Sequence, residues 1–457
     1  MIDEREALRI RYHRLYPLLL GFSGFLLLVG LLFGDIPSIP AGLWTILVTE
    51  DTLITDYIQI GGIGAAFVNA ALVTAASVRL LARSDETPNG YTLVAVGLMA
   101  GFSLFGKNIV NIWPILAGAW LYAKLQREPF GKYVSVALLS TSLAPVVSFV
   151  ALGGQPGSLP AGIALGVAIG FVLPPLSAYT FRVQNGMNLY NVGFACGLIA
   201  MLLVPVMTNF GARPQTALHW SQGNNAVFAP VLAALCILLV LAGLFLCARP
   251  AWAAWAGYRR LLQTTGRAPS DYLRMFGPAP VLINTGLNGL LSTLCILLTG
   301  GDLNGPTLGG IFTIMGFSAF GKHVRNILPI MAGVLLGGAL MEHGINAPAL
   351  QLAVLFGTTL APLSGYFGWP FGAAAGFLHA SVVLHAGSPV AGLNLYNNGF
   401  SGGLIAIALF PILTAILRRH KPVLQDEDYF DLFTQDAPQV PPPPGEERHS
   451  GEETPVP

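Results

Sequence analysis

Two stretches of the chain decide its fold class, because each of them occurs twice. The sequence FGKNIVNIWPI at residues 105–115 recurs as FGKHVRNILPI at residues 320–330. The sequence NLYNVGF at residues 188–194 recurs as NLYNNGF at residues 394–400, and GLIA follows soon after each copy. A duplicated apolar chain that keeps its polar residues is typical of transporters and channels, whose solute site usually lies where the repeats meet.

The composition places both motifs in a membrane protein. Of the 457 residues, 54% are hydrophobic and only 10% are charged, whereas soluble domains carry about 25% charged residues. The net charge of +1 gives no reason to expect a nucleic-acid partner. The four cysteines lie in apolar runs without CxxC spacing, so we expect no metal, no cofactor and no disulfide framework.

Apolar segments separated by polar, glycine or proline breaks fall into two sets. The first set lies at residues 15–34, 53–82, 91–105, 112–124, 133–152, 159–182, 187–209 and 226–248. The second set lies at residues 279–299, 306–320, 327–342, 348–367, 370–387 and 394–417. We therefore predict an all-α polytopic membrane protein with two repeats of about six helical segments each, including re-entrant or broken half-helices.

The predicted organisation has five parts. They are an N-terminus with a first span and outer loop (1–52), repeat 1 (53–209), a connecting span with a basic interfacial loop (210–278), repeat 2 (279–417) and a disordered tail (418–457). Segments 15–34 and 226–248 have no counterpart in the sequence comparison of the repeats. The stretch 249–275 combines tryptophans with arginines, which predicts an amphipathic helix on the membrane surface.

Basic residues set the expected orientation. The arginine-rich N-terminus, the loop at 249–274 and the basic residues after 417 all belong on the cytoplasmic side, whereas the loop around Glu50 and Asp51 has no basic residue. Both termini are then cytoplasmic, in a bacterial inner membrane. Segment 53–82 runs inward while its mate 279–299 runs outward, so the repeats are predicted to be inverted.

The first motif predicts a break at membrane depth. Segments 91–105 and 112–124 each extend roughly 20 Å as helices, which is short of a hydrocarbon core of about 30 Å. Glycine at the end of the first segment stops a helix, and Asn111 and Asn326 are placed to cap the helices that follow. A tip of this kind would present helix N-termini and a lysine to an anion or a carbonyl group. The alternative is an ordinary turn at the membrane surface.

The second motif has a binding and a structural interpretation. Asn188 and Asn394 could cap helices, and the GxxxG spacings at residues 193–197 and 399–403 could serve helix packing alone. Alternatively, the motif's other asparagines and its tyrosines contact a solute. Asn69 and Asn284 also match across the repeats. Since a proton or sodium path usually needs a buried carboxylate or histidine, the near absence of carboxylates inside the spans argues against carboxylate-based coupling.

The sequences GMNLYN at residues 186–191 and GLNLYN at residues 392–397, each followed by GLIA, resemble a signature of bacterial urea channels. That resemblance implies an inverted duplication with a narrow pore between its halves. It covers only these short segments, and the Asn-Pro-x-Ser-Gly pore segment of that family is missing here. As a whole, the chain is similar to an uncharacterised bacterial family of duplicated multi-spanning membrane proteins.

The sequence thus predicts a carrier for a small polar, anionic or carbonyl-bearing solute, with a passive urea or amide channel as the alternative. An intramembrane enzyme lacks support because HExxH and GxSxG are absent. The expected partners are the solute and the lipid bilayer, and the sequence leaves homo-oligomerisation open. The expected solute-binding residues are Lys107, Asn108, Asn111, Lys322, His323, Asn326, Asn191, Asn397, Tyr190, Tyr396, Asn69 and Asn284.

Overall fold

The computed structural model describes residues 15–84, 87–153, 158–246, 250–342 and 344–417. The expected cytoplasmic N-terminal arm and the expected disordered tail therefore lie outside the described residues. The first half contains α2 (Leu15–Phe33), α3 (Ile39–Val48), α4 (Tyr57–Ala82), α5 (Gly90–Phe102), α6 (Trp113–Leu125), α7 (Gly131–Ser140), α8 (Ala144–Ala151), α9 (Ser158–Val183) and α10 (Asn191–Asn209). The second half contains α11 (Asn225–Leu241), α12 (Ala251–Leu261), α13 (Tyr272–Phe276), α14 (Pro278–Leu298), α15 (Gly305–Phe317), α16 (Val324–Leu340), α17 (Pro348–Phe356), α18 (Ala361–Phe367), α19 (Trp369–Ala386) and α20 (Asn397–Leu417).

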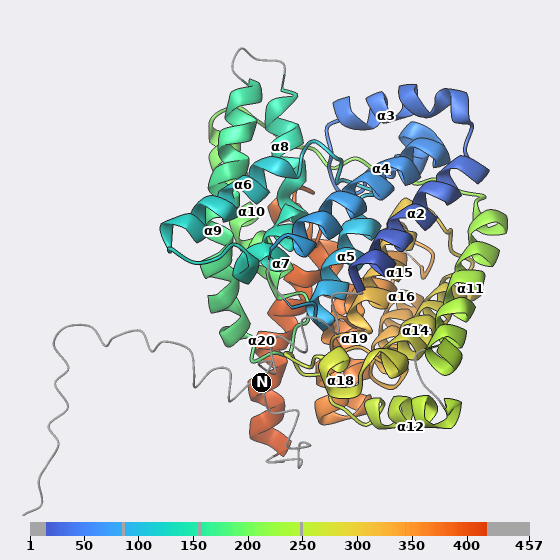
Figure 1. Ribbon diagram of the computed structural model, residues 1–457. Helices are drawn as coiled ribbons and strands as arrows, with labels where there is room; N and C mark the ends of the chain where they lie inside the picture. The colour runs from blue at the N-terminus through green and yellow to red at the C-terminus, as the bar shows by residue number, and fades with distance from the viewer. Residues whose placement is uncertain (1–14, 85–86, 154–157, 247–249, 343, 418–457) are drawn as a thin grey trace, which may run out of the picture.

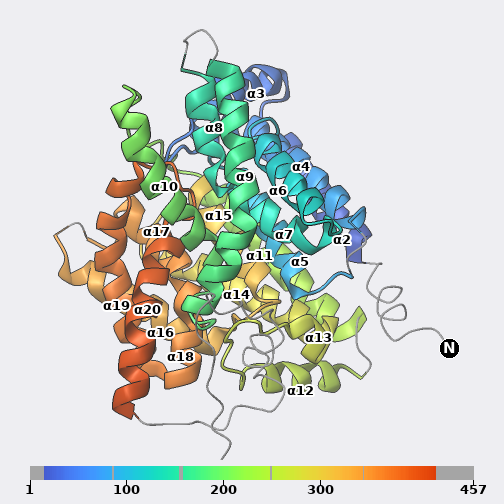
Figure 2. The ribbon, with the colours of Figure 1, turned by 90° about the vertical axis from the view of Figure 1, so that its left-hand side faces the viewer.

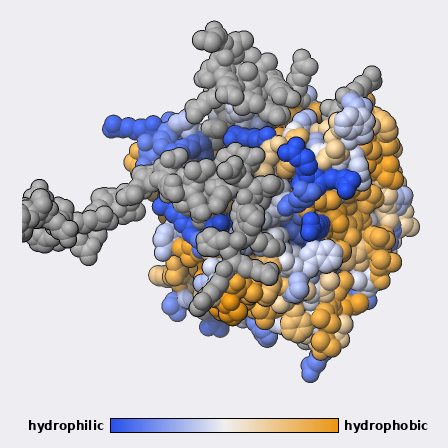
Figure 3. All heavy atoms as spheres, turned by 90° about the horizontal axis from the view of Figure 1, so that it is seen from below, coloured by the Kyte–Doolittle hydropathy of each residue, from blue (hydrophilic) through white to orange (hydrophobic). Residues whose placement is uncertain are grey.

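The described residues form helices and contain no strand, which confirms the predicted all-α polytopic class (Figure 1). Nine helical segments within them are long and apolar enough to cross a membrane. The helices α5 and α15 are too short to do so and match the predicted half-helices. Seen from below, hydrophobic side chains cover much of the molecule's periphery (Figure 3), as expected for a surface in contact with lipid.

The outer helices extend the repeat beyond its sequence boundaries. Helix α2 lies antiparallel on α4, where the Ser23 hydroxyl donates to the Ala71 carbonyl at 2.7 Å. Helix α11 lies in the same way on α14, where a Cβ atom added to Gly286 would lie 2.4 Å from the Cys236 carbonyl oxygen. Helices α2 and α11, which lie in the segments for which the sequence showed no counterpart, are thus counterparts of each other. Both helices are mostly exposed on the outside of the molecule, where contact with lipid would require only apolar character.

The two halves are inverted. Helix α3 packs beside α4 and helix α12 beside α14, so the two short helices occupy equivalent places. In both ribbon views α3 lies across the top of the molecule and α12 across the bottom (Figures 1 and 2). Trp44 on α3 and Trp252 on α12 are exposed, which suits helices lying in a membrane interface. The helix expected within 249–275 is therefore present, and its partner α3 was not foreseen.

The half-helices α5 and α15 cross backbone to backbone at the centre. A Cβ atom added to Gly101 would lie 2.6 Å from the Gly309 carbonyl oxygen, and one added to Gly97 would lie 2.9 Å from the Gly316 Cα. Such close crossing requires small residues in both helices. Of the cysteines, Cys196 and Cys236 are buried, Cys295 is half-buried, and Cys247 lies outside the described residues.

Candidate functional site

Each half-helix ends in an unwound tip that is buried in protein. Gly106 and Gly321 adopt φ values of 85° and 90°, which end the helix as predicted because glycine tolerates this left-handed region. Lys107 and Lys322, the residues that follow them, are fully buried. A turn solvated at the membrane surface would leave these lysines exposed, so the geometry favours the buried break.

Asn69 and Asn284 hold the tips in place. The Asn69 side-chain amide donates to the carbonyls of Ser103 and Lys107 at 2.7 and 2.9 Å. The Asn284 amide donates to the carbonyls of Ser318 and Lys322 at 2.8 and 2.7 Å. These carbonyls have left the helical ladder and would otherwise be unsatisfied in an apolar region. The match of the two asparagines across the repeats therefore reflects backbone support.

The caps of the tips differ from the prediction. Asn108, rather than Asn111, accepts from the backbone of Val110 and Asn111, at 3.0 and 2.9 Å. His323, rather than Asn326, is the N-cap of α16, and its Nδ1 accepts from the Asn326 N–H at 3.3 Å. The prediction for Asn326 is wrong because this residue lies one turn into α16 and bonds back to His323 in a capping box. The prediction for Asn111 is wrong because α6 begins after Ile112, and the Asn111 side chain instead accepts from the Asn108 N–H at 3.0 Å. The capping bonds engage several of the N–H groups expected to face a solute.

The two buried lysines reach across the interface between the repeats. The Lys107 Nζ donates to the Tyr396 hydroxyl at 2.6 Å, and its other polar contact is the Met99 sulfur at 3.6 Å. The Lys322 Nζ donates to the hydroxyls of Tyr190 and Thr358, the latter at 2.7 Å. Each half therefore supplies a lysine to the tyrosine of the other half.

No carboxylate neutralises these lysines in the described part of the chain, where neither forms an ion pair. Aromatic rings, instead of a carboxylate, surround each lysine Nζ. The Lys107 Nζ lies 4.6 Å from the Tyr396 ring centre and 5.4 Å from that of Phe102. The Lys322 Nζ lies 4.4 Å from the Tyr190 ring centre and 5.1 Å from that of Phe317. Cation–π contact offsets only part of the cost of burying a charge.

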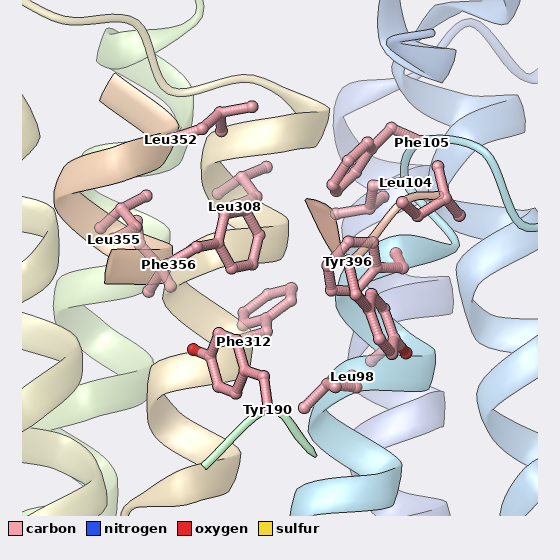
Figure 4. Packing of buried hydrophobic residues seen from close by; sticks show 14 of the residues in the cluster. Leu98, Leu104, Phe105, Tyr190, Leu308, Phe312, Leu352, Leu355, Phe356 and Tyr396 are labelled. Carbon is pink, nitrogen blue, oxygen red and sulfur yellow. The ribbon is translucent and has the colours of Figure 1, made fainter. Parts of the chain in front are cut away.

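A small cavity lies between the two lysine–tyrosine pairs. It has room for roughly one water molecule, about 10 Å³, and is lined by Leu98, Phe102, Tyr190, Thr313, Phe356, Leu395, Tyr396, Asn398 and Gly399. The close view shows the hydroxyls of Tyr190 and Tyr396 pointing to opposite sides (Figure 4). The cavity is therefore walled by aromatic rings, with one ammonium group behind each tyrosine.

The NLYN motifs tie the two halves together. The Asn188 amide donates to the Gly399 carbonyl at 3.1 Å, and the Asn394 amide donates to the Gly193 carbonyl at 3.2 Å. Neither residue is the N-cap of its helix, since α10 begins at Asn191 and α20 at Asn397. Both asparagines are nevertheless structural, because they bridge the two halves. The glycines allow α10 and α20 to touch, since a Cβ on Gly193 would lie 2.7 Å from the Tyr396 Cβ.

The next asparagines of the motifs differ between the halves. Asn191 is bound by α9, accepting from the Thr180 hydroxyl at 2.8 Å and donating to the Ser177 carbonyl at 2.8 Å. Asn397 is also buried, but its Oδ1 has no hydrogen-bond partner within the described residues. Asn398 lines the cavity, and its Oδ1 lies 3.0 Å from the His379 Nε2.

Sequence reasoning missed Asp51, which it placed in an outer loop. The residue is fully buried and its Oδ2 accepts from Ser148, Asn111 and Asn108 at 2.8, 3.0 and 3.4 Å. Its Oδ1 accepts from the Tyr57 hydroxyl at 2.8 Å. The chain folds back so that this residue meets the first tip, and no local pattern in the sequence signals that contact.

These features define a multi-pass α-helical membrane protein made of two inverted halves, with two buried lysines and aromatic walls at its centre. The chain belongs to the family described as "Protein of unknown function (DUF1576)", whose model matches residues 36–209 and again 252–415. The two matches confirm the predicted membership of a duplicated, uncharacterised family. No curated protein and no solved structure matches the chain, so the resemblance to urea channels finds no support here.

Proposed function

We propose that the protein is a secondary carrier for a small anionic or carbonyl-bearing solute, which binds between the two inverted halves. One observation carries this proposal: two fully buried lysine side chains flank the interface, and neither has an acidic partner within the described residues. A buried charge is stable only when it is paired or neutralised. An anion that reached both lysines when the halves move apart would supply the counter-charge that each ammonium group needs.

The closed centre favours a carrier over a channel. The rings of Phe102 and Tyr396 lie 4.4 Å apart, and those of Phe102 and Phe356 lie 5.3 Å apart. A solute larger than water enters this space only if the halves move relative to each other, and inverted repeats are the usual basis of such alternating access. The urea-type alternative is weakened further because Asn188 and Asn394 of the NLYN motifs form hydrogen bonds between the halves, which leaves their amides less free to face a solute.

The proposal includes a location and excludes an enzymatic role. We place the carrier in a bacterial inner membrane with both termini in the cytoplasm, on the strength of its arginine distribution. The α12 end, which carries Arg259 and Arg260, would then face the cytoplasm, and the α3 end would face outward. We assign no catalytic residue and no cofactor.

A thermal-unfolding screen of the purified protein tests the proposal. The probes are sulfate, phosphate, succinate, glutamate and urea. An anion at a hundred times its dissociation constant should stabilise the protein by about 2.7 kcal/mol. The Lys107→Met and Lys322→Met variants should lose that stabilisation, while Lys124→Met, which removes an exposed lysine from α6, should keep it. Equal stabilisation of all variants, or a response to urea alone, would contradict an anion site at the lysines.

A further inference from the structure

We propose that Asp51 is the proton-carrying residue that couples proton movement to transport of the anion bound near Lys107. This inference rests on the proposed carrier function and adds the coupling ion to it. The sequence showed almost no carboxylate inside the spans and so argued against carboxylate-based coupling. Asp51 supplies a buried carboxylate from a segment between two helices.

The contacts of Asp51 suit a group that gains and loses a proton. Its two carboxylate oxygens accept from one tyrosine hydroxyl, one serine hydroxyl and two asparagine amides, all of which are neutral. The four donors stabilise the ionised form, while complete burial favours the protonated form. Because no lysine or arginine of the described residues forms an ion pair with the carboxylate, a proton can enter without breaking one.

The second half shows that the tip does not need this acid. Gly266 takes the equivalent place, and a Cβ atom there would lie 2.1 Å from the Gly321 carbonyl oxygen and 2.6 Å from the Asn326 Nδ2. Gly365 stands where Ser148 stands, and its Cβ would lie 2.0 Å from the Thr265 carbonyl oxygen. Backbone thus fills the space that a carboxylate and a hydroxyl occupy in the first half. The second tip adopts the same fold without an acid, so the fold of a tip does not require Asp51. We therefore infer that Asp51 has a function that is specific to the first half.

The charged and titratable groups near Asp51 make their own contacts. Tyr57 of α4 is the titratable group that touches it. Lys107 on the tip turns to Tyr396, and the Asp56 carboxylate accepts from Ser221 and from the backbones of Ile58 and Gly305. His219 meets this segment through backbone bonds with Ile54 and Asp56.

Asp51 belongs to the segment between α3 and α4, outside the membrane-spanning helices. Burial raises the pKa of its carboxyl to about 7, so the group can exchange protons near neutral pH.

Protonation would act on the anion site through the tip. The ionised carboxylate puts a negative charge beside Asn108, the residue next to Lys107, and so opposes an anion there. Protonation removes this charge, and the new O–H can donate to the Ser148 oxygen, 2.8 Å away. The bonds from Asn108 and Asn111 to the same oxygen then weaken. Proton and anion therefore favour each other's binding, since such coupling is reciprocal. The expected process is symport: one proton binds Asp51 on one side of the membrane and leaves it on the other.

Proteoliposomes with a trapped pH-sensitive dye test the coupling. The probes are sulfate, phosphate, succinate and glutamate, added outside. In the wild-type protein, uptake of the transported anion should acidify the lumen. With one proton per anion, each unit of inward pH gradient should raise the accumulation ratio about tenfold beyond that for the anion alone. The Asp51→Asn variant should lose this response, while Glu50→Gln, which changes an exposed neighbouring acid, should keep it.

The outcomes separate coupling from transport. Anion uptake by the wild-type protein without proton movement would overturn the role of Asp51 but not the carrier proposal. This outcome does not depend on whether the Asp51→Asn variant folds. A pH response that persists in Asp51→Asn would do the same. If no anion is taken up, the carrier proposal fails. Infrared pH titration then decides about Asp51: a carboxylic-acid band that is absent from Asp51→Asn and present in Glu50→Gln supports a titrating Asp51, and an unchanged band overturns it.

Discussion

The ammonium of Lys107 donates a 2.6 Å hydrogen bond to the hydroxyl of Tyr396, and the two residues belong to opposite halves of the molecule. The same contact recurs between Lys322 and Tyr190. Because each half supplies the partner of the other half's lysine, relative motion of the halves must break or remake both pairs. The central site and the conformational change thus depend on the same bonds.

Loss of either tyrosine hydroxyl should destabilise the closed form. In Tyr396→Phe or Tyr190→Phe a buried ammonium loses an acceptor, and an unsatisfied buried group costs about 1–3 kcal/mol. Thermal unfolding in detergent should report the loss. Tyr179→Phe, which changes a tyrosine 66% exposed on α9, is the matched control and should unfold like the wild type. Equal stability of all three variants would refute the importance of these hydroxyls.

Replacing Asn69 or Asn284 with leucine should also destabilise the protein. Each amide satisfies two carbonyls of an unwound tip, so each variant should lose roughly 2–6 kcal/mol, at about 1–3 kcal/mol for each stranded carbonyl. Unfolding in detergent at a series of temperatures measures the effect. Asn209→Leu, at an exposed position at the end of α10, tests whether any asparagine would give the same result.

A thiol at a tip should be shielded from reagents. In a protein whose native cysteines are replaced by alanine, Lys107→Cys should react far more slowly with a water-soluble maleimide than Arg127→Cys, since Lys107 is buried and Arg127 is exposed. Labelling rates in intact membranes provide the measurement. Reaction of both positions at one rate would place the tip at the surface and remove the buried break.

The inversion of the halves predicts labelling from opposite sides of the membrane. Trp44→Cys on α3 should react with an impermeant thiol reagent from one side only, and Trp252→Cys on α12 from the other side only. The two tryptophans are exposed and lie on helices at opposite ends of the molecule. Labelling before and after permeabilisation of the cells compares the two faces. Labelling of both from the same side would rule out inverted halves.

Adding volume where α5 and α15 cross should be costly. Gly101→Val places a side chain 2.6 Å from the Gly309 carbonyl oxygen, and overpacking of this kind typically costs about 1–3 kcal/mol or more. Gly24→Val, where an added Cβ atom meets nothing within 4 Å, should cost far less. The two unfolding midpoints, measured side by side, check the prediction.

Local sequence rules predicted the elements that depend on local physics. Apolar length predicted the spans, and short segments around Gly106 and Gly321 predicted the half-helices and the tips. Charge bias predicted the inversion, which the opposite positions of α3 and α12 support. Each of these follows from the length, polarity or backbone freedom of a short segment.

The contacts between the tips and the rest of the chain could not be predicted in this way. Asn108 and Asn111 were expected to bind a solute, yet both are engaged by the tip backbone and by Asp51. Asn188 was considered as a cap and instead bridges the halves. A side chain's partner far along the chain depends on how helices pack, and a repeat pattern does not contain that information.

The sequence by itself determined that this protein is duplicated, apolar, all-helical and broken near two lysines, because composition, periodicity and glycine placement act within a few turns of chain. Only the tertiary structure decided that each lysine meets the other half's tyrosine, that the lipid-facing helices α2 and α11 are equivalent, and that Asp51 is buried against one tip. These relationships arise when segments far apart in the chain pack together, and the buried charges then depend on whichever neighbours the fold provides.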